Sequence, residues 1–340
     1  IRRPPRSTQS RSSAASDVYK RQIKDQPNQL AFLYVDLEKL ISLKPLAEAF
    51  KSVSDSTFSK IKPVSLAGVE TMDVTPAYEY ALAWEPSPAG RELPANIEPS
   101  GSLGVLQKLP ADMVLTVMLD GNLISSLKKS GLENIPVKEA GMAAKQLELL
   151  DEMKGLTLGI RGAPAGTLFP ELLLLLQPKN VKEFEQSTKE VLSSLLSLSG
   201  MPSIQWQDKE LAGNKTSYWF SPIGGVGIYL SRKDEVVALA SWESILSAYL
   251  SATPAGKGTL GGELQFINEE LSADSPLACI YVNFIKLGSL IETASGTLAM
   301  FTGGKPAIDL KEIQDLKKLG KVLLALRYHD YVARITARFE

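Results

Sequence analysis

The sequence predicts an α+β fold with mainly antiparallel sheets, helices packed on one face, and internally repeated strand-helix-strand-strand units. Two observations favour it. First, an apolar run of about seven residues, an Asp or Asn, and an apolar helical start recur along the chain, as in residues 110–127 (PADMVLTVMLDGNLISSL). Second, the helical segments alternate with hairpins rather than with single strands, and sheets connected in this way are mainly antiparallel.

Two copies of this pattern align closely. Residues 30–43 (LAFLYVDLEKLISL) and residues 277–290 (LACIYVNFIKLGSL) share eight identities in fourteen positions, and Lys39 pairs with Lys286. Together with residues 110–127 they give a period of about 82 residues. That period is too long for a solenoid repeat and suits a duplicated subdomain.

Asp36, Asp120 and Asn283 occupy the equivalent position, where each strand gives way to a helix. Asp and Asn both accept hydrogen bonds from backbone N–H groups at a helix start, whereas Asn cannot act as a general base. We therefore expect these side chains to cap helices rather than to form a carboxylate pair. A weaker copy at residues 236–246 places Ser241 in the capping position.

Residues 1–22 do not fit this pattern. They are basic, rich in Arg and Ser, and lack hydrophobic periodicity, a composition that predicts disorder. Residues 17–22 (DVYKRQ) resemble the translation of a transposon end used in preparing sequencing libraries. We interpret residues 1–22 as an adaptor-like artefact of a metagenomic fragment and expect the natural N-terminus, with any signal peptide, to be missing.

The rest of the chain is expected to form four segments. Residues 23–86 are the C-terminal part of a truncated first repeat unit, and residues 87–108 are a proline-rich linker. Residues 109–271 form a central α+β unit, and residues 272–340 form a final half-unit.

The first hairpin is expected at residues 66–85. Tyr78, Tyr80, Leu82 and Trp84 alternate with other residues there, which is the period of a half-buried strand with these side chains towards the core.

The central unit is expected to contain a helix at residues 137–153, a strand at 154–163, a wholly apolar central strand at 171–178, and a helix capped by Asn180. Further strands are expected at residues 203–211, 215–222 and 225–241, the last with a tight turn at Lys233 and Asp234. A helix at 241–250, a mobile loop at 251–262 and a closing hairpin at 319–340 complete the chain.

Composition and charge exclude several functions. Without residues 1–22 the chain has 31 basic and 37 acidic residues, a net charge of −6, and a mildly acidic body without a basic stripe argues against nucleic acid as a partner. No apolar run reaches the roughly 18 to 20 residues of a spanning helix, so no transmembrane segment is expected. We expect no cofactor and assign no metal site, although the sequence leaves open magnesium or calcium binding through carboxylates.

Cys279 and His329 are the only residues of their types. Cys279 lies in an expected buried strand, where a free Cys behaves as a small hydrophobe. His329 lies beside an expected hairpin turn, so we interpret it as a solvated turn residue. A single His and a single Cys cannot supply a zinc site.

One motif leaves a catalytic alternative open. Ser125 with Lys128, and Ser126 with Lys129, have the S-x-x-K spacing of serine acyl-transferases, although the partner motifs of that class are not evident. We interpret the motif as a solvated helix face. The glycine-rich residues 256–262 lack the Walker order and are interpreted as a mobile loop.

The starts LPAD (residues 109–112) and SADSP (residues 272–276), the strands ending in Asp or Asn, and the closing hairpin resemble a family of uncharacterised bacterial exported proteins and lipoproteins built from repeated units. The resemblance implies a periplasmic or envelope-associated protein. We expect a non-catalytic binding or structural module whose partner is a protein or an apolar small molecule in the cell envelope. The alternative is a serine hydrolase or acyl-transferase that uses Ser125 and Lys128.

Overall fold

The structure is a computed structural model that describes residues 29–36, 62–71, 77–85, 94, 96–100, 102–129, 152–164, 167, 169–198, 205–220, 227–254, 256–273, 275–302, 310–329 and 332–340. The chain divides into two compact units, one of residues 1–98, 125–141 and 324–340, the other of residues 99–124 and 142–323. We call them unit 1 and unit 2. Both are discontinuous in sequence, and the expected division into consecutive segments stays a prediction.

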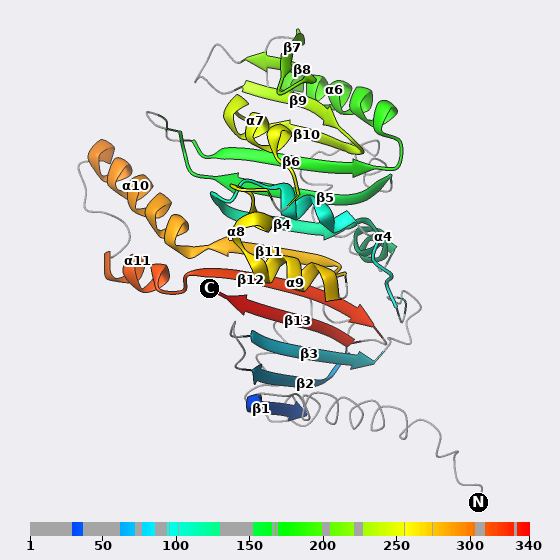
Figure 1. The fold of residues 1–340 in the computed structure, drawn as a ribbon, viewed down its shortest axis with the longest axis vertical. Helices are drawn as coiled ribbons and strands as arrows, with labels where there is room; N and C mark the ends of the chain where they lie inside the picture. The colour runs from blue at the N-terminus through cyan, green and yellow to red at the C-terminus, as the bar shows by residue number, and fades with distance from the viewer. Residues whose placement is uncertain are drawn as a thin grey trace, which may run out of the picture. The chain divides into compact units, whose positions relative to one another are not determined.

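Unit 1 contains an antiparallel sheet. Its strands are β1 (Gln29–Asp36), β2 (Lys62–Thr71), β3 (Ala77–Glu85), β13 (Val332–Phe339) and all but the first three residues of β12 (Lys321–His329). Their order in the sheet is β1-β2-β3-β13-β12 (Figure 1). Both expected hairpins are therefore confirmed, whereas residues 1–22 and the segment after Asp36 lie outside the described residues.

The aromatic residues of β3 do not all face a core. Tyr78 meets Phe339 edge to face, with 5.3 Å between ring centroids. Tyr80, however, is 42% exposed and lies opposite Ile335, which is 40% exposed. The expectation of a core-facing side chain is thus wrong for Tyr80, because a period of two fixes which residues share a face but not what covers that face.

Unit 2 contains eight strands in the order β11-β4-β5-β6-β10-β9-β8-β7 (Figure 1). Every pairing among them is antiparallel. The fold is thus mixed α and β and mostly antiparallel sheet, as expected. The strands are β4 (Met113–Asp120), β5 (Met153–Arg161), β6 (Glu171–Pro178), β7 (Gln207–Leu211), β8 (Asn214–Phe220), β9 (Gly227–Lys233), β10 (Val236–Ala240) and β11 (Ala278–Asn283).

The apolar strand β6 lies inside this sheet, as expected. The described helices are η2 (Ser102–Lys108, 3-10), α4 (Gly121–Lys129), α6 (Val181–Leu198), α7 (Glu243–Ser251), α8 (Leu260–Glu263), α9 (Gln265–Ala273), α10 (Phe284–Thr302) and α11 (Leu310–Lys317). The helix expected at 137–153 falls mostly outside the described residues, although Met153 itself begins β5.

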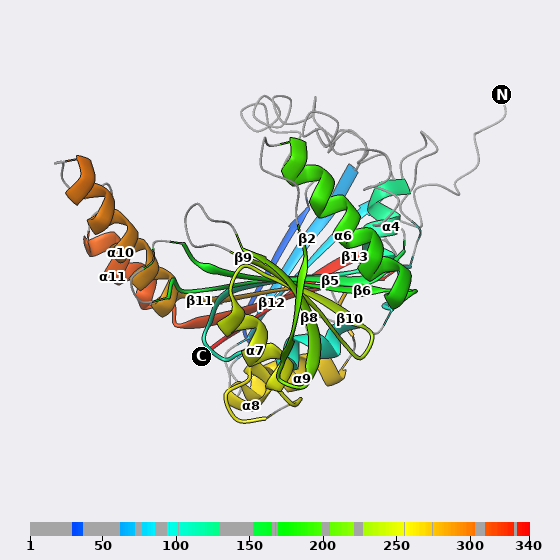
Figure 2. The same cartoon turned by 90° about the horizontal axis from the view of Figure 1, so that it is seen from above.

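Helices lie on both faces of the unit 2 sheet. Figure 2 shows α6 on one side and α7 on the other. Phe184 of α6 packs in a core with Leu176 and Val237, while Leu173 and Leu175 of β6 point to the opposite face and are also fully buried. The expected arrangement with helices on one face is not confirmed, because β6 is apolar on both sides and each side needs cover.

The strand-to-helix corners are capped as expected at two positions. Asp120 Oδ1 accepts from the backbone N–H of Asn122 at 2.8 Å, and Asn283 Oδ1 accepts from that of Lys286 at 3.0 Å. Ser241 does not cap. Its hydroxyl accepts from the backbone N–H of Leu172 at 2.8 Å, and α7 begins two residues later, at Glu243, with Trp242 at its N-cap and no side-chain cap.

The corner at Asp120 leaves no room for a side chain at the next residue. A Cβ on Gly121 would lie 2.1 Å from the carbonyl oxygen of Met153 and 2.8 Å from the carbonyl carbon of Lys154. The start of α4 thus touches the start of β5 backbone to backbone.

We therefore expect Gly121→Ala to destabilise the protein by about 3 kcal/mol or more, because neither backbone can move without breaking the sheet. Chemical denaturation with Gly104→Ala as the control measures this, since a Cβ on Gly104 meets nothing within 4 Å. Equal midpoints for the two variants would contradict the close approach.

The glycine-rich segment is packed rather than open. The Thr259 hydroxyl accepts from the backbone N–H of Gly262 at 3.1 Å and so caps α8. Leu260 is fully buried and donates its N–H to the carbonyl of Leu109 at 2.7 Å. The expectation of a mobile loop is wrong here because η2, inside the segment expected to be a linker, provides a surface against which α8 packs.

Candidate functional site

The described residues of unit 2 form an open cleft at one edge of its sheet, with a volume of about 670 Å³. The antiparallel register brings the start of β4, the end of β5 and the start of β6 to this edge, because Met113 lies opposite Arg161 and Arg161 opposite Glu171. Helices α7 and α10 supply the remaining walls. The lining residues are Asp112, Val114, Arg161, Gly162, Ala163, Pro164, Thr167, Glu171, Ser244, Lys286, Ser289, Leu290 and Thr293.

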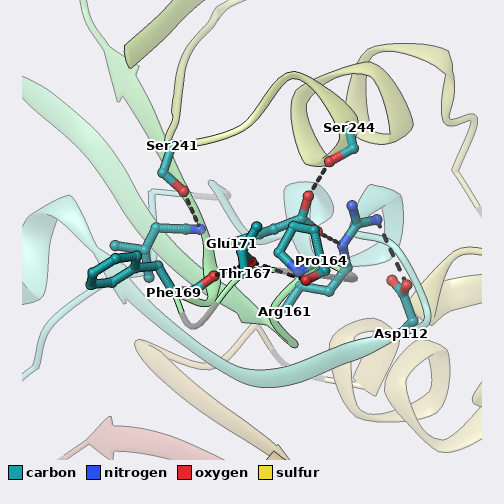
Figure 3. Close-up of polar contacts among 9 residues, drawn as sticks. Asp112, Arg161, Pro164, Thr167, Phe169, Glu171, Ser241 and Ser244 are labelled. Atoms are coloured by element: carbon teal, nitrogen blue, oxygen red, sulfur yellow. Dashed lines mark hydrogen bonds and ion pairs between the residues drawn. The ribbon is translucent and has the colours of Figure 1, made fainter. Parts of the chain in front are cut away.

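A buried carboxylate holds the centre of the cleft. The Glu171 side chain is only 2% exposed and forms an ion pair with Nε of Arg161. The Ser244 hydroxyl, from the first turn of α7, donates to the other carboxylate oxygen of Glu171. Arg161 also faces Asp112, with 3.6 Å between Nη1 and Oδ2, so its guanidinium stands between two carboxylates (Figure 3).

The connection between β5 and β6 is held by polar contacts at its described residues. The Thr167 hydroxyl donates to the carbonyl of Pro164 at 3.0 Å. On the other side of β6, Ser241 and Leu172 exchange two hydrogen bonds, one of 2.8 Å and one of 3.0 Å (Figure 3). These contacts fix the start of β6 against the end of β10, and with it the position of Glu171.

Helix α10 presents one face to the cleft. The residues that line it, Lys286, Ser289, Leu290 and Thr293, stand at positions i, i+3, i+4 and i+7, which share one face of a helix. The Lys286 side chain is half-buried, and burial is the main cause that lowers its pKa below the ordinary 10.5; Asp112 opposes this shift, while Lys321 and Arg161 add to it.

Searches of protein-family models, of curated proteins and of solved structures found no match. The chemistry of the cleft is therefore argued from its own residues.

Of the residues singled out from the sequence, Ser125, Cys279 and His329 do not line the cleft, whereas Asp112 and Lys286 do. Ser125 and Ser126 lie half-buried on α4, and the side chains of Lys128 and Lys129 lie outside the described residues. Cys279 is 1% exposed in β11, which confirms its place in the core. His329 is exposed at the end of β12, as expected.

The described part of the chain has neither a metal-binding cluster nor a membrane-spanning helix. No group of three or more His, Cys, Asp and Glu side chains in that part of the chain is placed to hold a metal ion. Among its helices, none combines the length and the apolar character needed to cross a bilayer.

Sequence reasoning missed Arg161, Glu171, Ser244 and Lys286 as a group. Two signals were present: Glu171 is an ionisable residue directly before five leucines, and Lys286 recurs as Lys39 in the repeat alignment. An acid next to a buried strand needs a cationic partner, because an unpaired buried carboxylate is costly. Asp112, part of the LPAD start, turns out to face the same arginine.

Proposed function

We propose that the protein is a non-catalytic binding module of the bacterial cell envelope and that the cleft of unit 2 is its ligand site. The observation that carries this proposal is the cleft itself: its volume of about 670 Å³ lies within the range of small-molecule sites, roughly 300 to 1,000 Å³. Its walls combine apolar side chains with a few fixed charges, which is the composition typical of such sites.

The two kinds of wall suggest two parts of a ligand. Val114, Ala163, Pro164 and Leu290 give apolar contacts, which support the expected apolar character of part of the ligand. Glu171, held by Arg161 and Ser244, is too tightly engaged to serve as a free base. The network therefore fixes the shape of the cleft.

Duplication of a small unit is the proposed origin of this architecture. The strands β1-β2-β3 and β4-β5-β6 both run through the sheet in chain order, and at both corners the residue that ends the strand, Asp120 or Asn283, caps the following helix. These features support the repeat of strand, helix, strand and strand. Placement in the envelope rests on the resemblance to exported proteins, and fractionation of cells that express the full-length protein tests it.

A blocked cleft tests the binding proposal. Thr293→Trp places a large ring on the cleft face of α10, whereas Ala294→Trp adds the same ring one residue away at an exposed position outside the lining. We expect ligands found in a thermal-shift screen of small metabolites and amphiphiles to lose at least about 10-fold in affinity with Thr293→Trp, because the ring fills the site. Ala294→Trp is expected to bind as the wild type does.

If both variants lost the same affinity, or if neither lost any, the ligand site would lie elsewhere. The alternative function, a serine hydrolase that uses Ser125 and Lys128, remains a prediction with a simple test. A fluorophosphonate probe that labels the wild-type chain but not Ser125→Ala, together with turnover of an ester, would replace the binding proposal.

A further inference from the structure

The charged side chains that line the cleft alternate in sign. The Glu171 carboxylate pairs with Arg161, and Arg161 faces Asp112, with 3.6 Å between Nη1 and Oδ2. Burial lowers the pKa of the Lys286 ammonium and Asp112 counteracts this shift, so Asp112 lies within electrostatic reach of Lys286 as well. The lining therefore carries two negative and two positive side chains, and their charges cancel.

This balance favours an uncharged ligand. A ligand with a net charge gives up part of its hydration on entering the cleft and finds no excess of opposite charge there. A hydroxyl group, by contrast, has one hydrogen to donate and two lone pairs that accept. Neighbouring hydroxyls of one ligand can thus donate to a carboxylate and accept from the cation beside it.

Three of the four charged side chains keep surface for such contacts. The Asp112 side chain is 53% exposed and that of Arg161 is 16% exposed, and Lys286 is half-buried. Glu171, at 2%, is closed off behind Arg161. The cleft therefore presents a fixed acceptor, the Asp112 carboxylate, between two fixed donors.

The hydroxyl groups further along α10 are set to accept. Ser289 donates its hydroxyl hydrogen to the carbonyl of Ile285 at 3.0 Å, and Thr293 donates its own to the carbonyl of Ser289 at 3.0 Å. Each oxygen has then used its one hydrogen and keeps only acceptor capacity. Both side chains are exposed and line the cleft, so a ligand that pairs with them has to bring donors.

The spacing of these acceptors sets the length of the ligand. Ser289 and Thr293 follow Lys286 by three and seven residues, which places them about 4 Å and about 10 Å further along the helix axis at 1.5 Å per residue. A free amino acid has its ammonium donors on a single atom and cannot serve both positions. A molecule with hydroxyl groups along its length can.

We infer that the cleft binds an uncharged sugar of two or more rings. Neighbouring hydroxyls of one ring bridge Asp112 and Lys286. Hydroxyls further along the sugar donate to Ser289 and Thr293, and the side chain of Leu290 contacts the C–H groups of the rings. The inference rests on the proposed function and adds the ligand class to it.

The first experiment is isothermal titration calorimetry with four uncharged disaccharides: maltose, cellobiose, trehalose and sucrose. Sodium glucuronate, glycine and inorganic phosphate are the charged and zwitterionic comparisons. At least one disaccharide is expected to bind roughly 10-fold more tightly than any of these three. Its affinity is expected to change less than about 2-fold between low salt and about 0.5 M salt, because an uncharged ligand offers no charge for salt to screen.

A second comparison tests the hydroxyl groups of α10 with that disaccharide. Thr293→Val keeps the shape of the side chain and removes the acceptor oxygen, so it is expected to weaken binding about 5-fold or more, the effect of one hydrogen bond. Thr297→Val is the matched control. The Thr297 hydroxyl makes the same kind of bond within the helix, to the carbonyl of Thr293 at 2.9 Å, but Thr297 does not line the cleft.

A third comparison tests the cationic donor. Lys286→Met is expected to weaken binding of the disaccharide roughly 10- to 100-fold, since a hydrogen bond to a charged group is lost. Lys286→Arg keeps a cationic donor and is expected to lose less. Lys318→Met is the control, because Lys318 is 75% exposed and pairs with Asp315 outside the cleft. Thermal unfolding checks that each variant is folded.

Four results would overturn the inference. They are no binding of any disaccharide, tighter or equal binding of glucuronate, glycine or phosphate, equal effects of Thr293→Val and Thr297→Val, or equal effects of Lys286→Met and Lys318→Met. A failure of the proposed function is distinct from these results. If ligands of another class bind and are excluded by Thr293→Trp but not by Ala294→Trp, the cleft is a ligand site without the sugar. If no ligand distinguishes those two variants, the proposed function fails as well.

Discussion

Replacing Arg161 with methionine is expected to destabilise the protein by about 3 to 5 kcal/mol, because the change leaves the Glu171 carboxylate buried without its cation. The Glu171 side chain is 2% exposed, so water cannot take the place of the guanidinium, and Ser244 supplies only one hydrogen bond. Equilibrium unfolding in urea measures the loss. Arg161→Lys is expected to lose less stability than Arg161→Met, because it keeps the positive charge. It is still expected to be less stable than the wild type, because an ammonium lacks the planar set of donors of the guanidinium.

The double variant Arg161→Met with Glu171→Met separates the charge from the packing. Removing both partners removes the unpaired charge, and apolar replacements of buried ion pairs are often neutral or stabilising. The double variant is therefore expected to recover more than half of the stability that the single variant loses. A loss below about 1 kcal/mol for Arg161→Met, the range of surface pairs, would mean that water reaches Glu171.

Local features of the fold could be predicted from the sequence, and contacts between distant segments could not. The caps at Asp120 and Asn283 depend on a single turn of chain, and both were predicted. Ser241 fits the same local pattern, yet its hydroxyl bonds to Leu172, 69 residues away. The backbone N–H of Leu172 competes with the start of α7 for this hydroxyl, and the local sequence around Ser241 contains no information about that neighbouring strand.

The same limit applies to the cleft. Both strands of the hairpin that joins Arg161 to Glu171 were predicted, but the pairing depends on register, which a long connection between strands does not fix. Lys286 was visible in the repeat, and its role depends on α10 lying beside β4. Tyr80 shows a similar limit. The alternation correctly predicted a strand at this position, but the side chain expected to face the core is exposed.

Asp120→Ala is expected to cost more than Asn283→Ala, although the two residues occupy the same position in the pattern. Both variants lose a cap, worth roughly 0.5 to 2 kcal/mol. Asp120 also accepts from the backbone N–H of Ser100 at 2.8 Å and from the Ser100 hydroxyl at 2.5 Å. Since Asp120 is fully buried, we expect a total loss of about 2 to 4 kcal/mol.

Two further variants divide that loss. Asp120→Asn keeps the oxygen that caps α4 but turns an amide donor towards the N–H of Ser100. Two donors then face each other, so we expect this variant to lose about 1 to 3 kcal/mol of stability, more than an Asp-to-Asn change at a residue that only caps a helix. Ser100→Ala removes only the hydroxyl, which also reaches the carbonyl of Lys154 at 2.6 Å, and it is expected to cost less.

Thermal unfolding of Asp120→Ala, Asp120→Asn, Ser100→Ala and Asn283→Ala ranks these contributions. Equal losses for Asp120→Ala and Asn283→Ala would show that Ser100 adds nothing to the corner. Loss of ligand binding in Asp120→Ala at unchanged stability would contradict the capping role itself. The expected order follows from the number of backbone N–H groups that lose a side-chain acceptor: those of Ser100 and Asn122 at Asp120, and that of Lys286 at Asn283.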